Sequence, residues 1–285
     1  MMDAASGGVG GELSAFTFWV GDTLCAVEVP HVLSVEQDLD RVQPTPFRIH
    51  GLIGAIKRRD RIVPVFDLAL LLGMRLLSEQ KEELIGDLSA REQDHIDWLD
   101  ALMTSIRDKT PFTKARDPGQ CAFGKWYAKF HSRDAELVAI LAQFERPHRR
   151  IHALADRLLD RVATGQAERA LRELAIERRT TLEELRRLFA RARRQVRDSM
   201  KSVLLFLTSD GALPELALRL DEISDIVAYT RDRLLPATDL NHNRDDTLAE
   251  VFPHYIAQQD GPDCLLVDAE RLVAMLTGGD RRAAS

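Results

Sequence analysis

The side chains best suited to chemistry in this sequence are three histidines and one cysteine near its middle: His95, Cys121, His148 and His152. His148 and His152 are four residues apart, so on a helix both imidazoles project from one face, with Cβ atoms about 6 Å apart. Structural zinc is usually held tetrahedrally by cysteine and histidine. Together these residues have the composition of a closed site for one zinc ion.

Each of these residues also has a simpler interpretation. Many histidine pairs of this spacing are solvated, His95 could be a hydrogen-bonded core histidine, and Cys121 could be a small buried apolar residue. Their placement favours metal binding, because the three histidines lie on apolar helix stripes. Cys121 follows Pro118 near an expected helix N-terminus, which favours the thiolate that binds metal.

The remaining histidines and cysteines lack this placement. The sequence places His131 at a helix junction, and four more histidines fall in or near loops of β regions: His31, His50, His242 and His254. Cys25 and Cys264 lie in strand-like runs and are expected to be buried apolar residues. No glutamate stands beside an open metal position as a general base, which disfavours hydrolytic zinc chemistry.

The elements that must position these residues are helices. From Ser89 to about Arg197 the apolar residues recur with helical spacing, which predicts an antiparallel bundle. The sequence from Ser89 to Glu92 has the spacing of a capping box and predicts a helix start there. Further starts are expected at Asp117-Pro118 and at Pro147, with a short helix between them and one long helix over 171–196.

The segments on either side of the bundle have the pattern of β-strands. Short apolar runs separated by turn residues predict strands at 16–20, 24–27, 32–35, 52–56, 62–66, 203–207, 215–220, 251–258 and 264–267. The segments 63–72 and 265–276 form a weak internal repeat. Each has the pattern of a strand, an aspartate N-cap and a short helix. Neither flank is large enough to close a sheet alone, so one interrupted β domain is favoured over two small ones.

Composition narrows the class of protein. The 285 residues carry a formal net charge of −6, which argues against sequence-independent nucleic-acid binding. No apolar run reaches the length of a membrane span, no signal peptide opens the chain, and the first dozen residues read as a glycine-rich tail. Three widely separated cysteines do not form a disulfide framework. These features predict a cytoplasmic protein.

The helical region resembles the chemoreceptor zinc-binding (CZB) domain. The motifs that carry this resemblance are His95-x-x-Trp98, Cys121-Ala-Phe-Gly-Lys-Trp-Tyr127 and His148-x-x-x-His152. The resemblance covers roughly 89–197 and implies that His95, Cys121, His148 and His152 ligate zinc. Homodimers through the bundle are frequent in that family.

The flanks resemble CheW, the coupling protein of bacterial chemotaxis. The matching segments are the hairpin at 18–27, Gly51-Leu-Ile-Gly-Ala-Ile56, Ile62-Val-Pro-Val-Phe-Asp-Leu68, 220–226 and, more loosely, 239–246. The resemblance implies an α+β multidomain protein: a CheW-like double β-barrel (SH3-like, five strands each) of residues 12–80 and 200–280, interrupted by the CZB bundle at 87–198. Lys57-Arg58-Arg59-Asp60 replaces the usual Asn-Leu-Arg-Gly, and Arg59 keeps the arginine of that partner-binding loop.

This double resemblance implies a non-catalytic adaptor between a chemoreceptor cytoplasmic tip and a CheA-like histidine kinase, without insertion into the membrane. The bundle is expected to sense zinc or an oxidant such as hypochlorite. Three alternatives stay open: purely structural zinc, a metal-free bundle, and a thiol-redox protein that uses Cys121 with a nearby histidine. The basic stretch 178–197 is expected to be a solvated helix face rather than a site for an anionic partner.

Overall fold

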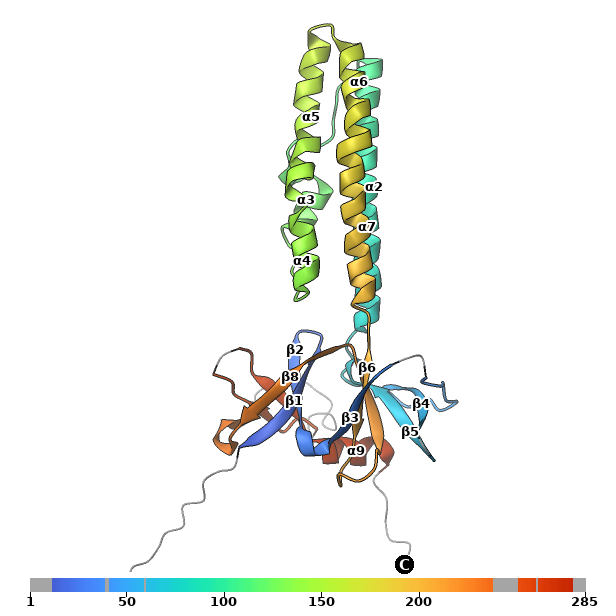
Figure 1. Ribbon diagram of the computed structural model, residues 1–285, viewed down its shortest axis with the longest axis vertical. Helices are drawn as coiled ribbons and strands as arrows, with labels where there is room; N and C mark the ends of the chain where they lie inside the picture. The colour runs from blue at the N-terminus through green and yellow to red at the C-terminus, as the bar shows by residue number, and fades with distance from the viewer. Residues whose placement is uncertain (1–11, 39–40, 59, 238–250, 260, 279–285) are drawn as a thin grey trace, which may run out of the picture. The chain divides into compact units, whose positions relative to one another are not determined.

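The computed structural model describes residues 12–38, 41–58, 60–237, 251–259 and 261–278 (Figure 1). The chain divides into two compact units, one of Met1–Leu77 with Lys201–Ser285 and one of Ser78–Met200. The first is built of β-sheets and the second of helices. The fold class is therefore α+β, a β unit interrupted by a helical bundle, as expected. The glycine-rich tail, Arg59, His242 and the segment 239–246 lie outside the described residues.

The described residues of the β unit form two sheets. The larger has six strands in the order β8-β1-β2-β11-β10-β9, and the smaller has five in the order β3-β6-β7-β5-β4. The bounds of the first sheet are Glu222–Tyr229, Leu13–Val20, Thr23–Glu28, Cys264–Val267, His254–Ile256 and Leu234–Pro236. Those of the second are Val32–Gln37, Val203–Leu207, Leu216–Leu220, Arg61–Asp67 and Leu52–Arg58.

The weak internal repeat in the sequence corresponds to a repeated structural unit. β5 pairs parallel with β7, and β11 pairs parallel with β2. β5 and β11 are each followed by a helix with an aspartate N-cap: Asp67 caps α1 (Leu68–Leu71), and Asp268 caps α9 (Ala269–Thr277). Apolar residues of both sheets share one core, including Phe18, which is fully buried. Because β6 and β7 follow the insert and pair with β3 and β5, the β unit needs both flanks of the chain.

Several strand predictions need correction. The described residues form sheets of six and five strands, whereas the resemblance implied five in each. The prediction missed β8 and β9, and within 251–258 only His254–Ile256 is a strand. β8 was missed because most of its residues are exposed, so it lacks the apolar alternation that marks a half-buried strand.

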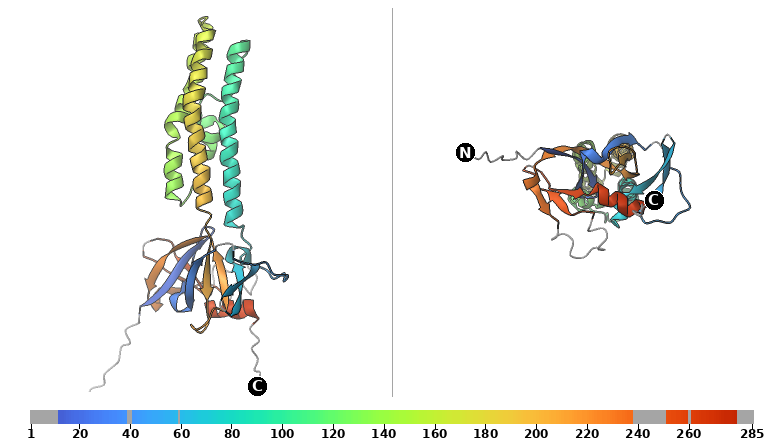
Figure 2. Two further views of the ribbon diagram at one scale, coloured as in Figure 1. Left: turned by 45° about the vertical axis from the view of Figure 1, so that its right-hand side comes forward. Right: turned by 90° about the horizontal axis from the view of Figure 1, so that it is seen from below.

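The helical unit contains two long antiparallel runs and a shorter one, which lie side by side in Figures 1 and 2. Its elements are α2 (Leu77–Asp108), α3 (Ala122–Tyr127), α4 (Ala135–Ala142), α5 (Glu145–Ala163), α6 (Ala167–Glu177), a π-helical turn η3 (Arg178–Leu182) and α7 (Glu183–Asp198). A single apolar core fills the bundle, from Ile85 on α2 to Val196 on α7. Among the described helices, none has the length and apolar content needed to cross a lipid bilayer.

Two of the expected helix starts were wrong, and the last long helix is not uniform. α2 begins at Leu77 and passes through Ser89, whose hydroxyl donates to the Ile85 carbonyl within the helix instead of capping a new one. Pro118 opens only a 3-10 turn (Pro118–Gln120), and α3 begins after Cys121. The long last helix contains the π-turn. At Ser89, packing of the apolar stripe, with Ile85 and Leu88 in the core, overrides the local start signal.

Candidate metal centre

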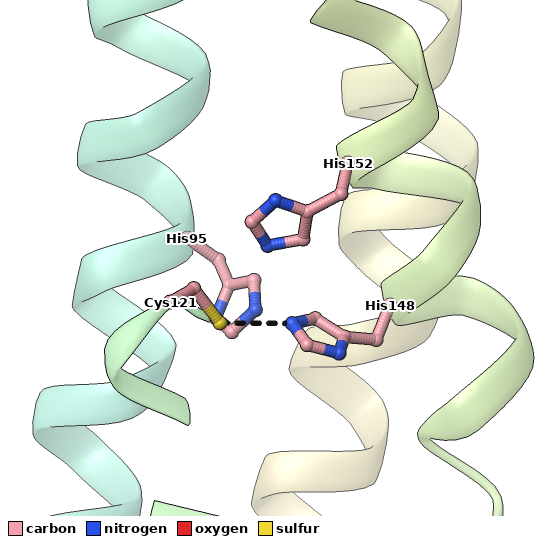
Figure 3. A group of neighbouring side chains, drawn as sticks. All are labelled: His95, Cys121, His148 and His152. Carbon is pink, nitrogen blue, oxygen red and sulfur yellow. Dashed lines mark hydrogen bonds between the residues drawn. The ribbon is translucent and has the colours of Figure 1, made fainter. Parts of the chain in front are cut away.

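The structure brings the four sequence-predicted ligands together in the helical bundle (Figure 3). His95 comes from the middle of α2, Cys121 from the residue before α3, and His148 and His152 from successive turns of α5. One ligand atom from each residue lies within 4.8 Å of all the others. The three histidines are buried, with 2–6% of their surface exposed, and Cys121 is partly buried. The cluster is therefore a closed constellation inside one unit.

The orientation of His95 is set by its own helix. Nδ1 of His95 lies 2.7 Å from the Arg91 carbonyl oxygen and donates to it. The tautomer with a proton on Nδ1 leaves the lone pair of Nε2 free, and this atom is buried without a hydrogen-bond partner. A metal-ligating histidine commonly has this arrangement, with the second nitrogen bound to a carbonyl.

Cys121 is positioned by a tight turn. It is the N-cap of α3, and its sulfur accepts a hydrogen bond from the Gly124 N–H at 3.2 Å. A Cβ at Gly124 would lie 2.1 Å from the Pro118 carbonyl oxygen, so only glycine allows the 3-10 turn to pack on α3. This explains the glycine in the Cys-x-Phe-Gly string, a role that the sequence reading did not assign.

The three imidazoles are held in the neutral form. Burial lowers the pKa of His95, and its contact with the Arg91 carbonyl offsets this only in part. Burial and the neighbouring histidines lower the pKa of His148 to about 3. Burial and His95 lower that of His152 to about 4. Neutral imidazole is the form that binds a metal, so the cluster needs no deprotonation of histidine at neutral pH.

The thiol of Cys121 behaves differently from the sequence-based expectation. Burial raises its pKa, although the N–H groups of Gly124 and Phe123 act in the opposite direction. The sulfur lies 3.1 Å from Nε2 of His148 and 3.2 Å from the Pro118 carbonyl oxygen. With a raised thiol pKa and a lowered imidazole pKa, this pair is neutral rather than a thiolate–imidazolium. A helix N-terminus alone does not activate Cys121, whereas a bound metal cation would stabilise its thiolate.

Aromatic rings surround the cluster and limit access of water. The rings of Phe123 and Phe189 lie 5.6 and 5.8 Å from that of His95, and Trp98 lies 5.0 Å from His152. Trp98 donates from Nε1 to the Ala115 carbonyl at 2.7 Å and so anchors the chain that leads to Cys121. Phe189 was not recognised from the sequence, although it lies on the same apolar face as Leu185 and Ala192.

The donor set fits zinc. Zinc–nitrogen distances of about 2.0–2.1 Å and zinc–sulfur distances of about 2.3 Å place the ligand atoms of a tetrahedron roughly 3.5 Å apart. A spread of up to 4.8 Å therefore needs only small side-chain rotations to close. The cluster in the described residues contains no carboxylate. Ring nitrogens that are buried without a partner, on His95 and on His152, are accounted for if they ligate a metal.

The other residues singled out from the sequence lie elsewhere. His131, His50 and His254 are exposed, and His31 is half-buried, with Nδ1 3.1 Å from the Thr208 carbonyl oxygen. Cys25 and Cys264 are buried in β-strands and form no disulfide, as expected. Next to the position of Arg59, Arg58 pairs with Glu36 at 2.8 Å and stacks on Phe206. The basic helix face is partly paired, since Arg186 and Arg193 both contact Glu92 of α2.

Comparison with known proteins gives two matches. The family model described as the chemoreceptor zinc-binding domain matches residues 95–159, a segment that begins at the first ligand and contains all four. The resemblance named for the helical region is thus confirmed. The chain is also similar to the crystal structure of scaffolding protein TtCheW from Thermoanaerobacter tengcongensis, with 9% identity, a TM-score of 0.40 and 90% of each chain covered. No curated protein matches this chain.

Proposed function

We propose that this chain is a non-catalytic cytoplasmic adaptor that couples chemoreceptors to a CheA-type histidine kinase, and that its helical unit binds one zinc ion and responds to zinc or to oxidants. The observation that carries the zinc site is the convergence of one cysteine and three neutral histidines within 4.8 Å inside the bundle. His95, Cys121, His148 and His152 are its ligands. A bound zinc ion would supply charge to hold Cys121 as thiolate.

The oxidant response follows from the chemistry of that thiolate. Hypochlorous acid transfers its oxygen to the thiolate sulfur, which gives a sulfenic acid and releases chloride. The product is a poorer ligand, so the site would lose affinity for zinc. Since zinc-binding energy is also folding energy, the segment 118–127 and α5 would lose the constraint that joins them to α2.

Structural zinc is the second candidate, because the aromatic rings around the cluster shield it from solvent. A thiol-redox enzyme is disfavoured by the neutral state of the Cys121–His148 pair, since a reactive cysteine needs a lowered pKa. The adaptor role is supported by the CheW-like motifs of both flanks, which belong to one β unit. The proposed partner contact is Arg59.

Metal analysis of the purified chain tests the zinc site. Wild type should contain one zinc per chain, and Cys121→Ala and His152→Ala should lose it. Two matched controls should keep zinc: Cys264→Ala and His131→Ala. Cys264 is a buried thiol of the β unit, and His131 is an exposed histidine of the bundle. Absence of zinc from wild type prepared without chelator, and no uptake on adding it, would refute the site.

The sensing step has a separate test. Zinc release on addition of hypochlorite should follow oxidation of the zinc-bound Cys121 thiolate in wild type. Release without oxidation of Cys121, or oxidation without release, would leave zinc as a structural element.

The adaptor role requires that the chain bind a CheA-like kinase and a receptor tip in pull-down assays, and Arg59→Ala should weaken one of these contacts. Failure to bind either partner would contradict it.

A further inference from the structure

A buried carboxylate, outside the ligand set of the metal centre, lies at the end of α6. The side chain of Glu177 is only 7% exposed. It accepts two hydrogen bonds from Arg150, at 2.9 and 3.1 Å, and one from the hydroxyl of Thr181 at 2.5 Å. Arg157 lies 3.8 Å away. Removing a carboxylate from water is costly unless it is paired and hydrogen-bonded, so its geometry is strongly determined by these partners.

The partner of this carboxylate lies between two of the metal ligands in sequence, and its half-exposed side chain projects from the opposite face of α5. Arg150 is two residues from both His148 and His152, about 3 Å along the helix axis from each. Its guanidinium forms a two-point contact with Glu177, which fixes orientation as well as distance. Glu177 therefore contacts α5 from the face opposite the two ligands and constrains the position of the helix that carries them.

Arg178, the residue after Glu177, contacts α2, the helix that carries His95. Arg178 donates to Asp100 of α2, five residues after His95. Successive residues of a helix point about 100° apart, so Glu177 can face α5 while Arg178 faces α2. Arg178 also begins the π-turn, and Thr181, with 1% of its surface exposed, lies inside it. Such turns are rare and occur frequently at functional sites.

We propose that Glu177 and Arg178 are positioning residues of the metal centre, which join α5 and α2 at the π-turn and set the spacing of the ligands on which metal affinity depends. This inference rests on the proposed zinc site. By linkage, an interaction that favours metal binding is itself favoured when metal binds. Zinc should therefore order the π-turn, which lies between α6 and α7 in a helical run that ends at Asp198 and leads into β6.

The test compares Glu177→Gln with Glu173→Gln in the full chain. Glu173 also joins α6 to α5, through Arg157 at 2.7 Å and Arg161 at 3.2 Å, but neither arginine adjoins a ligand. Zinc affinity is measured by competition with a chromophoric chelator. Hydrogen exchange of the π-turn amides is measured with and without zinc. Arg150→Lys keeps the charge and loses the two-point contact, and it serves if Glu177→Gln does not fold.

Glu177→Gln and Arg150→Lys should each weaken zinc binding about tenfold, the lower end of the range for residues that orient metal ligands. Glu173→Gln should bind as wild type does. Zinc should slow exchange in the π-turn of wild type and Glu173→Gln but not of Glu177→Gln. Unchanged affinity in both test variants, or equal weakening in Glu173→Gln, would overturn the inference while leaving the zinc site intact. Failure of wild type to bind zinc would remove the site itself.

Discussion

Acidification of the metal-free protein is a direct test of the electrostatics of the histidine cluster. The pKa values of His148 and His152 are lowered from 6.5 to about 3 and about 4. Between those values and 6.5 the unfolded chain binds more protons than the folded one. Stability should therefore be fully present above pH 6.5 and should fall as the pH decreases through this window.

The size of the effect follows from the pKa differences. Each pKa unit corresponds to about 1.4 kcal/mol. At about pH 5 the folded imidazoles remain neutral while their unfolded counterparts are protonated, so each histidine removes about 2 kcal/mol of unfolding free energy, or about 4 kcal/mol for the pair. His95, whose pKa is also lowered, acts in the same direction. Domains typically have only about 5–15 kcal/mol of stability, so the bundle should become marginal.

Urea unfolding with excess chelator, at about pH 7.5 and about pH 5, measures this loss. Circular dichroism at the helical band follows the bundle, because most of the helices lie in that unit. The double variant His148→Leu/His152→Leu should lose about 4 kcal/mol less than wild type on acidification, while the exposed control His131→Leu should behave as wild type. A wild-type loss under about 1 kcal/mol would refute the assignment of buried, neutral imidazoles.

Two substitutions test how the centre is built. Gly124→Ala forces a Cβ against the Pro118 carbonyl oxygen and should weaken zinc binding about tenfold in chelator competition. The control Gly86→Ala adds a Cβ in open space and should leave zinc affinity unchanged. Equal zinc affinities in the two variants would contradict the tight-turn argument. Phe189→Ala empties a fully buried position and should lower the unfolding free energy by about 3–5 kcal/mol in urea titrations, against about 0.5 kcal/mol or less for exposed Val138→Ala. Similar losses in both would mean that Phe189 is not a core residue.

The features predicted correctly from the sequence are those with a local signal. The β1–β2 hairpin, the Asp-capped helices after β5 and β11, and the apolar stripes of α2 and α5 all follow from residues within one or two turns of each other. The clustering of His95, Cys121, His148 and His152 was predictable for the same reason. A histidine on an apolar stripe must face the bundle core. Because the core of a small bundle is narrow, three such histidines and one cysteine are expected to lie close together.

Features that depend on distant residues were missed or misplaced. Ser89 has a local signal for a helix start, but packing of Ile85 and Leu88 extends α2 through it. β8 pairs with β1 across most of the chain, and its exposed side chains carry no periodic signal. Nothing in the stretch 177–182 predicts a π-turn, because the turn is stabilised by contacts of Glu177 and Arg178 with two other helices.

The chemical state of the centre also depends on the tertiary structure. The sequence alone determined which residues could ligate zinc and that they belong to a helical bundle between two parts of a β unit. Only the fold decided that the Nε2 lone pair of His95 is free, that all three imidazoles are neutral and that the Cys121 thiol has a raised pKa. The physical reason is that pKa values and tautomers depend on desolvation and on hydrogen-bond partners, which neighbours distant in sequence supply only after folding.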